Sequence, residues 1–283
     1  MSRSMAFYGK GGVGKSTVVA NLTATLAAGG KRVLQVGCDP KRDSSRNLIK
    51  VFPPITMMEL LAEGRTNLVP EDIVMDGGDG VDCIEAGGPR PGVGCAGRGL
   101  GRMFEELEEM SIFDRDYDYV LYDVLGDVVC GGFAVPMRSG YAEEVYVVTS
   151  GEFMSLYAAN NIARGIRNYA EDGDVRMGGL IANVKDLAYD RDLIERFAER
   201  IGTKVVFYLE WDRVVYEAER RRSTVLRHAP DHPFCGRLRE LADTIAAGPE
   251  LHIPNPMSDR ELDVFLEELF GFRTEPALAG GCG

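Results

Sequence analysis

Short apolar runs alternate along the chain with longer segments of helical period. Several runs are continuously apolar, as expected for parallel strands that helices cover on both faces. The runs predict strands at residues 4–8, 32–36, 81–85, 117–122, 144–149, 178–182 and 204–208. The periodic segments predict helices at residues 15–28, 99–110, 153–169, 188–201, 213–221, 233–246 and 258–269. We therefore expect a doubly wound α/β fold with a mostly parallel sheet.

No internal repeat or change of composition divides the chain, so residues 1–273 are expected to form a single domain. Residues 274–283 end in Pro-Ala-Leu-Ala-Gly-Gly-Cys-Gly and predict a flexible C-terminal tail. Before that tail, Ser258 is followed three residues later by Glu261, which predicts a capping box at the start of the last helix.

The segment after the first predicted strand fits the phosphate-loop pattern G-x-x-x-x-G-K-[ST] and opens a predicted helix, as the motif requires. It consists of Gly9, Lys10, Gly11, Gly12, Val13, Gly14, Lys15 and Ser16, with Thr17 next. The glycines allow backbone N–H groups to face phosphate oxygens, Lys15 would neutralise the β and γ oxygens, and Ser16 could ligate Mg²⁺. A glycine turn with a chance lysine is the alternative. The context favours nucleotide binding in a P-loop NTPase fold.

Lys10 is a second lysine within this loop, which makes the motif a deviant Walker A. A phosphate loop needs only one lysine of its own, so Lys10 could act on a phosphate held by a facing subunit. That role would tie hydrolysis to a dimer. A solvated surface lysine is the alternative.

Two aspartates follow predicted strands at the edge where sheets of this type bind ligands. Asp123 stands where a Walker-B carboxylate would hold Mg²⁺ through water, and Asp39 could orient or activate the attacking water. Either could instead be an ordinary turn or N-cap residue. Residues 123–126 also fit D-x-x-G, in which the amide of Gly126 would sense the γ-phosphate, with a plain turn as the alternative.

Among the six cysteines there is no Cys-x-x-Cys pair, which argues against a zinc ribbon or a cluster held within one chain. Cys95 and Cys130 are each set among glycines, whose N–H groups can approach the sulfur atom. Two such cysteines are half the ligands of a [4Fe–4S] cluster, and a symmetric dimer would supply the other half. A reactive thiol or a packing residue remains the alternative for each.

The other four cysteines carry weaker signals. Cys38 and Cys83 fall at the end and in the middle of predicted strands, where core packing is the more common role. Cys235 and Cys282 receive no role.

An excess of acidic residues limits the classes of partner. The chain has 44 Asp and Glu against 32 Lys and Arg, a net charge of −12. Polyphosphate repels such a chain, which argues against nucleic acid. No apolar run reaches the roughly 20 residues that span a bilayer, and the loop at Gly9 leaves no room for a signal peptide. We expect a cytoplasmic protein with no membrane contact.

Five stretches resemble the nitrogenase iron protein (dinitrogenase reductase) family and its nitrogenase-like relatives. They are residues 8–17, 37–45 (GCDPKRDSS), 85–99 (EAGGPRPGVGCAGRG), 122–136 (YDVLGDVVCGGFAVP) and 151–165 (GEFMSLYAANNIARG). The resemblance implies a homodimer that bridges one [4Fe–4S] cluster through Cys95 and Cys130, with MgATP at each phosphate loop. It implies an ATP-dependent reductase that passes single low-potential electrons to a larger metallocluster-bearing catalytic protein. A ferredoxin or flavodoxin would be its own electron donor.

The resemblance also implies roles for single residues. By position these are Lys10 as the trans-acting lysine, Asp39 and Asp123 as switch carboxylates, Lys41, Asp43 and Asp127 as further switch-region residues, Asn183 as the adenine contact, and Asp212 as a residue on the nucleotide side. Arg98 matches an exposed arginine that touches the partner protein and is ADP-ribosylated in some members. A solvated loop arginine is the alternative for Arg98.

The resemblance weakens after Asn183. Where the family usually carries Pro-Arg-Asp before Val-Val, this chain has Glu210, Trp211 and Asp212, and residues 184–192 do not match the usual loop. The substrate of the partner therefore stays open among nitrogenase-like systems: dinitrogen, a methylthio-alkane, a tetrapyrrole or a nickel porphinoid precursor.

The alternative from another class is a non-redox, partition-type ATPase switch. Septum-positioning proteins of that type end in a membrane-binding helix, whereas residues 258–272 here are acidic. An iron–sulfur scaffold ATPase is a third class, and it predicts a Cys-x-x-Cys near the C-terminus that this chain lacks.

Overall fold

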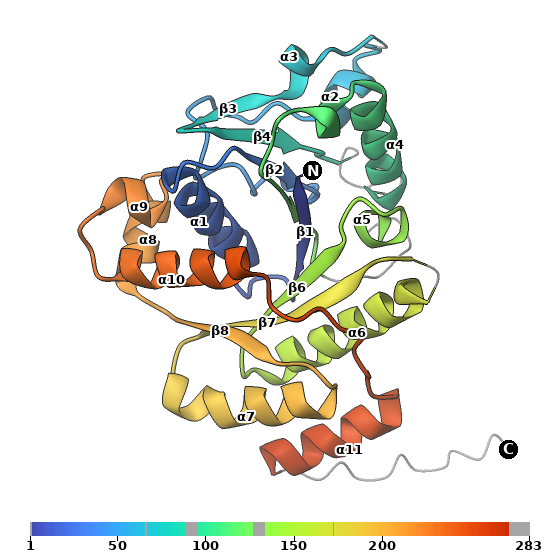
Figure 1. Cartoon of the computed structure of the whole chain (residues 1–283), viewed down its shortest axis with the longest axis vertical. Coiled ribbons are helices and arrows are strands. Elements are labelled where there is room, and N and C mark those ends of the chain that lie inside the picture. Colours follow the sequence, from blue (N-terminus) through green and yellow to red (C-terminus); the bar gives the residue numbers. More distant parts are fainter. Residues whose placement is uncertain (1, 66, 89–95, 127–133, 172, 272–283) are drawn as a thin grey trace, which may run out of the picture.

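Eight strands form one sheet in the order β3-β4-β2-β5-β1-β6-β7-β8. The computed structural model describes residues 2–65, 67–88, 96–126, 134–171 and 173–271 (Figure 1). Every neighbouring pair of strands is parallel except β3 and β4. The strands are β1 (Arg3–Tyr8), β2 (Val33–Gly37), β3 (Met75–Gly78), β4 (Val81–Glu85), β5 (Tyr119–Asp123), β6 (Glu144–Thr149), β7 (Arg176–Val184) and β8 (Val205–Glu210). The predicted α/β fold with a mostly parallel sheet is confirmed.

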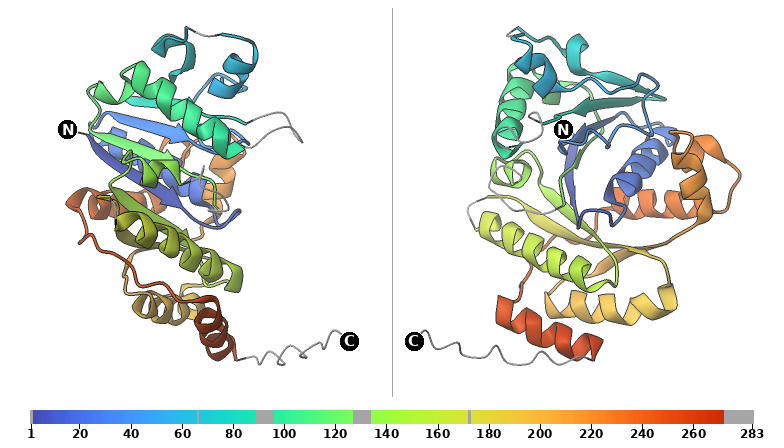
Figure 2. Two further views of the ribbon diagram at one scale, coloured as in Figure 1. Left: turned by 90° about the vertical axis from the view of Figure 1, so that its right-hand side faces the viewer. Right: turned by 180° about the vertical axis from the view of Figure 1, so that it is seen from behind.

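Helices cover both faces of this sheet (Figures 1 and 2). They are α1 (Lys15–Ala28), α2 (Met57–Ala62), α3 (Pro70–Ile73), α4 (Ala96–Glu109), α5 (Val135–Arg138), α6 (Phe153–Ala170), α7 (Leu187–Arg200), α8 (Arg213–Glu219), α9 (Val225–His228), α10 (Phe234–Ala247) and α11 (Asp259–Phe270). No helix within the described ranges combines the length and apolar character needed to cross a membrane.

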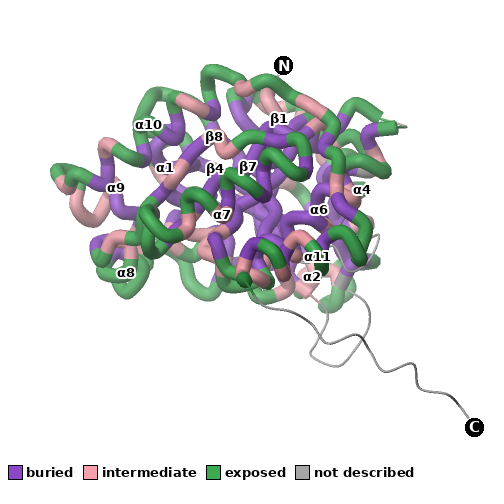
Figure 3. The backbone as a smooth tube through the Cα atoms, turned by 90° about the horizontal axis from the view of Figure 1, so that it is seen from below, coloured by how far each residue is buried: buried purple, intermediate pink, exposed green. Residues whose placement is uncertain are grey.

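Successive residues of β1 enter two different hydrophobic cores. Ala6 and Tyr8 join the core that packs under α4, α6, α7 and α11. Met5 and Phe7 join the core under α1, α8, α9 and α10. All four are completely buried, because the central strand has helices on both sides. The burial-coloured tube shows the same arrangement, with buried strands inside and exposed outer helix faces (Figure 3).

The long elements lie within a few residues of their predicted ranges, but short ones were missed. β3 contains two glycines and only one apolar residue, so no apolar run marks it. The helices α2, α3, α5 and α9 have six residues or fewer, too few for a helical period to show. The predicted boundary at residue 273 remains a prediction, and residues 274–283 lie outside the described ranges.

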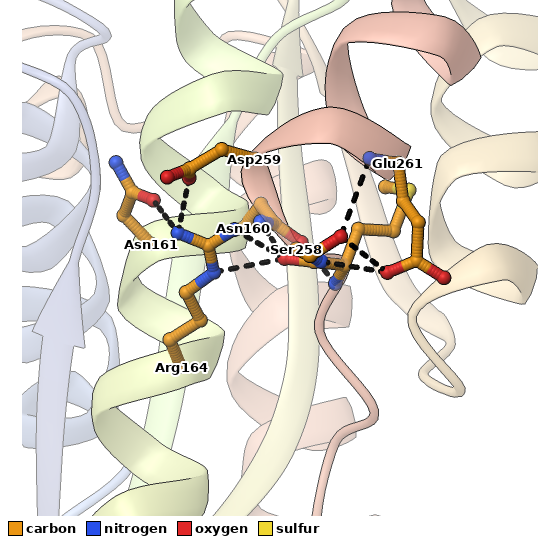
Figure 4. Close-up of polar contacts among 7 residues, drawn as sticks. Asn160, Asn161, Arg164, Ser258, Asp259 and Glu261 are labelled. Atoms are coloured by element: carbon orange, nitrogen blue, oxygen red, sulfur yellow. Dashed lines mark hydrogen bonds and ion pairs between the residues drawn. The ribbon is translucent and has the colours of Figure 1, made fainter.

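Polar side chains of α6 hold the segment that leads into α11 (Figure 4). The side chain of Asn160, fully buried, donates to Met257 O at 3.0 Å and accepts from Met257 N at 2.9 Å. Arg164 Nε donates to the same carbonyl at 2.8 Å. The predicted capping box is present, since Ser258 Oγ accepts from Glu261 N at 3.3 Å and Glu261 Oε2 accepts from Ser258 N at 2.8 Å.

Replacing Asn160 by alanine tests this attachment of α11. Asn160→Ala leaves the N–H of Met257 buried without its acceptor, so we expect the free energy of unfolding to fall by about 1–3 kcal/mol. Asn161→Ala on the next position of α6 is the control, because that side chain is partly exposed and makes one long contact with Arg164 at 3.5 Å. Urea denaturation should separate the two variants, and equal midpoints would contradict the proposed anchoring.

Candidate nucleotide-binding site

The predicted phosphate loop joins the carboxyl end of β1 to the first turn of α1. Two neighbouring strand ends are tied to this region by backbone hydrogen bonds: Val124 N donates to Phe7 O at 3.1 Å, and Cys38 N donates to Asp123 O at 2.9 Å. In the parallel register Gly37 of β2 pairs with Asp123 of β5 on one side. The segments after β1, β2 and β5 therefore meet at one edge of the sheet.

Lys15 and Asp123 form a buried ion pair at this edge. Lys15 Nζ donates to Asp123 Oδ1, and the two side chains are 8% and 1% exposed. Lys15 Nζ also lies 3.5 Å from Ser16 Oγ. Asp123 Oδ2 is buried and has no hydrogen-bond partner among the described residues. The lysine that would bind phosphate is thus held by the carboxylate predicted to serve Mg²⁺.

The segment after β2 adds two more carboxylates. Asp39 Oδ1 accepts from Lys41 N at 2.9 Å, and Lys41 Nζ lies 3.6 Å from Asp39 Oδ2. Asp43 Oδ1 is buried and, within the described chain, has no partner. Burial raises the pKa of Asp43, and the negative charges of Asp39 and Asp123 raise it further. Negative charge is therefore in excess here, which favours a bound cation.

The donor atoms fit a hydrated Mg²⁺ ion that a nucleotide also ligates. Ser16 and Asp43 line a cavity of about 310 Å³ whose lining also includes Arg46, Arg220 and Arg222. The carboxylate suits the ion, and the arginines suit the phosphate oxygens that would ligate it. No group of three or more His, Cys, Asp or Glu side chains within the described ranges is placed to bind a metal directly. Mg²⁺ commonly keeps several waters and takes few protein ligands beside phosphate oxygens, so the Ser16 hydroxyl and water-mediated contacts to aspartates suit it.

Sequence reasoning missed a fourth carboxylate, Glu85 at the end of β4. Its Oε1 accepts from Ser45 N at 2.7 Å and from Ser45 Oγ at 2.6 Å, which ties β4 to the segment after β2. Its Oε2 is buried without a partner in the described chain. Burial raises the pKa of Glu85 to about 7, against the lowering effect of the Ser45 hydrogen bonds. A glutamate that closes an otherwise mostly apolar strand was the available signal.

Two glycines are required where other parts of the chain approach the loop. Gly14 has φ +90°, and a Cβ there would lie 2.5 Å from Asn183 Nδ2. Gly126, the glycine of the D-x-x-G pattern, packs on the backbone of the loop. A Cβ at residue 126 would lie 2.2 Å from Gly9 O and 2.7 Å from Gly11 N. The segment after β5 is therefore in direct contact with the phosphate loop.

A cavity of about 290 Å³ lies beside the loop, near the lower end of the range for small-molecule pockets. Its lining comes from the loop, β7, β8, α8 and α10, and includes Val13, Asn183, Trp211, Glu219, Phe234 and Leu238. Asn183 Nδ2 donates to Val13 O at 2.8 Å, so the side-chain oxygen remains available as an acceptor. That acceptor suits the exocyclic amine of adenine.

The positions of the remaining predicted site residues do not test their predicted roles. Lys10 is on the surface, 3.5 Å from Glu152 Oε2. Thr17 Oγ1 donates a hydrogen bond to Glu219 Oε1 at 2.5 Å. Asp212 caps α8 by accepting from Val214 N at 2.8 Å. Arg98 is exposed in the first turn of α4.

The cysteines divide into those the structure describes and those it does not. Cys38, Cys83 and Cys235 are free and completely buried, so the first two are core residues as predicted. Asp127 and the three remaining cysteines, Cys95, Cys130 and Cys282, lie outside the described residues.

A phosphate loop between the first strand and first helix of this sheet defines the class: the protein has the P-loop NTPase fold. The family model for 4Fe-4S iron sulfur cluster binding proteins of the NifH/frxC family matches residues 3–271. The chain therefore belongs to the NifH/frxC family.

Several solved structures share the fold at low sequence identity. The septum site-determining protein MinD from Pyrococcus horikoshii OT3, complexed with Mg-ADP, is 21% identical with a TM-score of 0.67, over 87% of this chain and 96% of that one. A ParA family ATPase from Chlorobium tepidum TLS is 20% identical with a TM-score of 0.66, over 86% and 99%. Cobyrinic acid a,c-diamide synthase from Mycobacterium smegmatis is 21% identical with a TM-score of 0.64, over 87% and 95%.

The contact of Gly126 with the loop can be tested with a single methyl group. Gly126→Ala forces the loop backbone to move, and we expect MgATP affinity to fall about tenfold or more and stability to fall by about 1–3 kcal/mol. Gly101→Ala in α4 is the matched control, because its Cβ meets nothing within 4 Å. Calorimetric binding and thermal unfolding would measure both, and a Gly126→Ala protein indistinguishable from wild type would refute the contact.

Glu85 should make stability depend on pH. Its pKa rises from 4.5 in the unfolded chain to about 7, so the folded protein binds more protons between these values. Stability is therefore lost as pH rises through this window. The free energy of unfolding of Glu85→Gln minus that of wild type should therefore increase by on the order of 3 kcal/mol as the pH is raised from about 5 to about 8. Urea denaturation across this range measures it, and a constant difference would contradict the raised pKa.

Proposed function

We propose that the protein is a MgATP-dependent, one-electron donor that works as a cytoplasmic homodimer. The observation that carries the proposal is the match of residues 3–271 to a family of 4Fe-4S cluster binding proteins. Two features of the chain support it: the pair of glycine-flanked cysteines, Cys95 and Cys130, and the contact of Gly126 with the phosphate loop. Together they support a link between a cluster-binding segment and the nucleotide site.

Nucleotide binding would act first on the Lys15–Asp123 ion pair. The β and γ phosphate oxygens compete with Asp123 for the ammonium group of Lys15, since both are anions. Asp123 then has both carboxylate oxygens available for waters around Mg²⁺, and Asp43 faces the same ion. MinD has been solved with Mg-ADP on this fold, which supports a magnesium nucleotide as the ligand. Hydrolysis would use a water oriented by Asp39 and a second cation, Lys10 of the facing subunit.

The exchange at Lys15 would reach Cys130 along the segment after β5. Asp123 begins the segment that packs through Gly126 on the loop and continues, four residues later, to Cys130. Cys38 N donates to Asp123 O at 2.9 Å, which links the segment after β2 to the same strand end. A contact that exists only with the γ-phosphate bound would bias both segments toward one conformation.

Cys95 and Cys130 of each subunit would hold the cluster across the dimer axis. When bound, the [4Fe–4S] cluster supplies one low-potential electron. The chain's own contribution is to position the four thiolates and to couple that position to the nucleotide.

The electron acceptor would be a larger metallocluster-bearing protein. Arg98 is exposed at the start of α4, directly after the segment that carries Cys95, and is a local positive group on a chain of net charge −12. Such a charge can guide docking of a protein with a complementary acidic surface. Nitrogenase and the nitrogenase-like reductases of methylthio-alkanes, tetrapyrroles and nickel porphinoid precursors are the candidate partner systems, with a ferredoxin or flavodoxin as donor.

A non-redox ATPase switch is the second candidate, and the observation in its favour is the fold shared with MinD and ParA proteins. Such a switch needs no glycine-flanked pair of cysteines. The C-terminal helix α11 also carries Asp259, Glu261, Asp263, Glu267 and Glu268, a composition that an anionic membrane repels. The family match favours the redox role.

Removing one proposed cluster ligand separates the two candidates. Anaerobically purified wild-type protein should contain about four irons per dimer and give an EPR signal after reduction that changes with MgATP. Cys130→Ser should lose nearly all of this iron, because half of the thiolates are missing. Cys235→Ala, which removes a buried thiol of α10, should retain it. Full iron content in Cys130→Ser would exclude the bridging cluster, and a colourless wild-type ATPase would favour the partition-type switch.

A further inference from the structure

Trp211 lies at the mouth of the cavity beside the phosphate loop and is the only tryptophan of the chain. Its backbone is fixed on both sides. Trp211 N donates to Val184 O at 2.7 Å, next to Asn183 at the end of β7, and the following residue, Asp212, caps α8. The indole is nevertheless 57% exposed. The fold thus holds a large aromatic ring at a defined place without covering it.

The ring has no aromatic or cation–π partner within the described part of the chain. Two aromatic rings near it, the exposed Tyr216 and the half-buried Tyr208, each have an arginine partner. Arg220 lies over the ring of Tyr216, 5.8 Å from its centroid, and Arg191 lies 4.9 Å from the ring of Tyr208. An indole left free at the rim of a cavity is a surface on which a ligand can stack.

The rest of the cavity restricts what that ligand can be. One end is the phosphate loop, where Gly12, Val13 and Gly14 contribute to the lining. The lining also has an apolar part, with Phe234 and Leu238 of α10, which are 6% and 0% exposed, and it includes the carboxylates Glu152, Asp190, Glu210 and Glu219. A molecule with phosphate beside the loop and a flat, apolar group against Phe234 and Leu238 would match these parts of the lining. A nucleotide has this chemistry.

We propose that Trp211 is the stacking surface for the base of the nucleotide bound at the phosphate loop. The inference rests on the nucleotide site of the proposed function and adds a residue to it. Stacking accepts any base because every base has a π face. Trp211 would therefore provide affinity for the base, while the side-chain oxygen of Asn183 provides the preference for adenine.

The test compares ligands with and without a base. MgATP, MgGTP and magnesium tripolyphosphate are titrated by calorimetry into wild type, Trp211→Ala, Trp211→Phe and the control Tyr216→Ala, an exposed aromatic of α8 that does not line the cavity. Trp211→Ala should lower the affinities for MgATP and MgGTP by similar factors of about 5- to 100-fold, and the affinity for tripolyphosphate should not change. Trp211→Phe should retain most of the affinity, and Tyr216→Ala should match wild type. In wild type, tryptophan fluorescence should change with MgATP but not with tripolyphosphate.

The outcomes separate the stacking role from the nucleotide site and from the electron-donor function. The stacking role is wrong if Trp211→Ala binds MgATP as tightly as wild type does. It is also wrong if the substitution lowers the affinity for tripolyphosphate by the same factor as the affinity for MgATP. If wild type binds neither MgATP nor tripolyphosphate, the nucleotide site itself is wrong. If the base-dependent loss is found in a protein without cluster iron, the stacking role stands and only the electron-donor function fails.

Discussion

The ion pair between Lys15 and Asp123 is the interaction on which the rest of the site depends. It joins the start of α1 to the end of β5 in a place where both side chains are almost completely buried. Removing one partner of such a pair leaves an uncompensated charge, which costs about 3–5 kcal/mol. Only a ligand that brings both an anion for Lys15 and a cation for Asp123 can separate them cheaply. A magnesium nucleotide carries this combination, whereas free phosphate or free Mg²⁺ carries half of it.

The surroundings of this pair are rich in carboxylates, which favours a bound cation. Asp39, Asp43 and Glu85 all lie near Asp123, and against them the segment offers the ammonium groups of Lys15 and Lys41. Burial and mutual repulsion raise the pKa of Asp43, and they raise the pKa of Glu85 to about 7. The same arrangement links β4, β2 and β5 at one edge, because Glu85 also holds Ser45. A cation bound beside Asp123 would therefore interact with groups on the neighbouring strands.

The sequence predicts the parts of this protein that depend on local pattern. Buried strands appear as apolar runs, and the phosphate loop appears as a glycine motif between a strand and a helix. What it could not predict depends on contacts between distant residues. Lys15 and Asp123 are 108 residues apart, and nothing in either motif says that they pair. The close approach of Gly126 to Gly9, the burial of Glu85 and the exposure of Trp211 likewise arise only when strands and loops meet in the folded chain.

The position of Gly126 sets a length scale for communication within one subunit. Four residues separate it from Cys130. A chain of that length reaches at most about 14 Å when fully extended. The Cα atom of residue 130 therefore cannot lie farther than this from the Cα atom of Gly126, which itself packs on the phosphate loop in this structure. If the proposed coupling exists, it has this short covalent route and need not pass through either hydrophobic core.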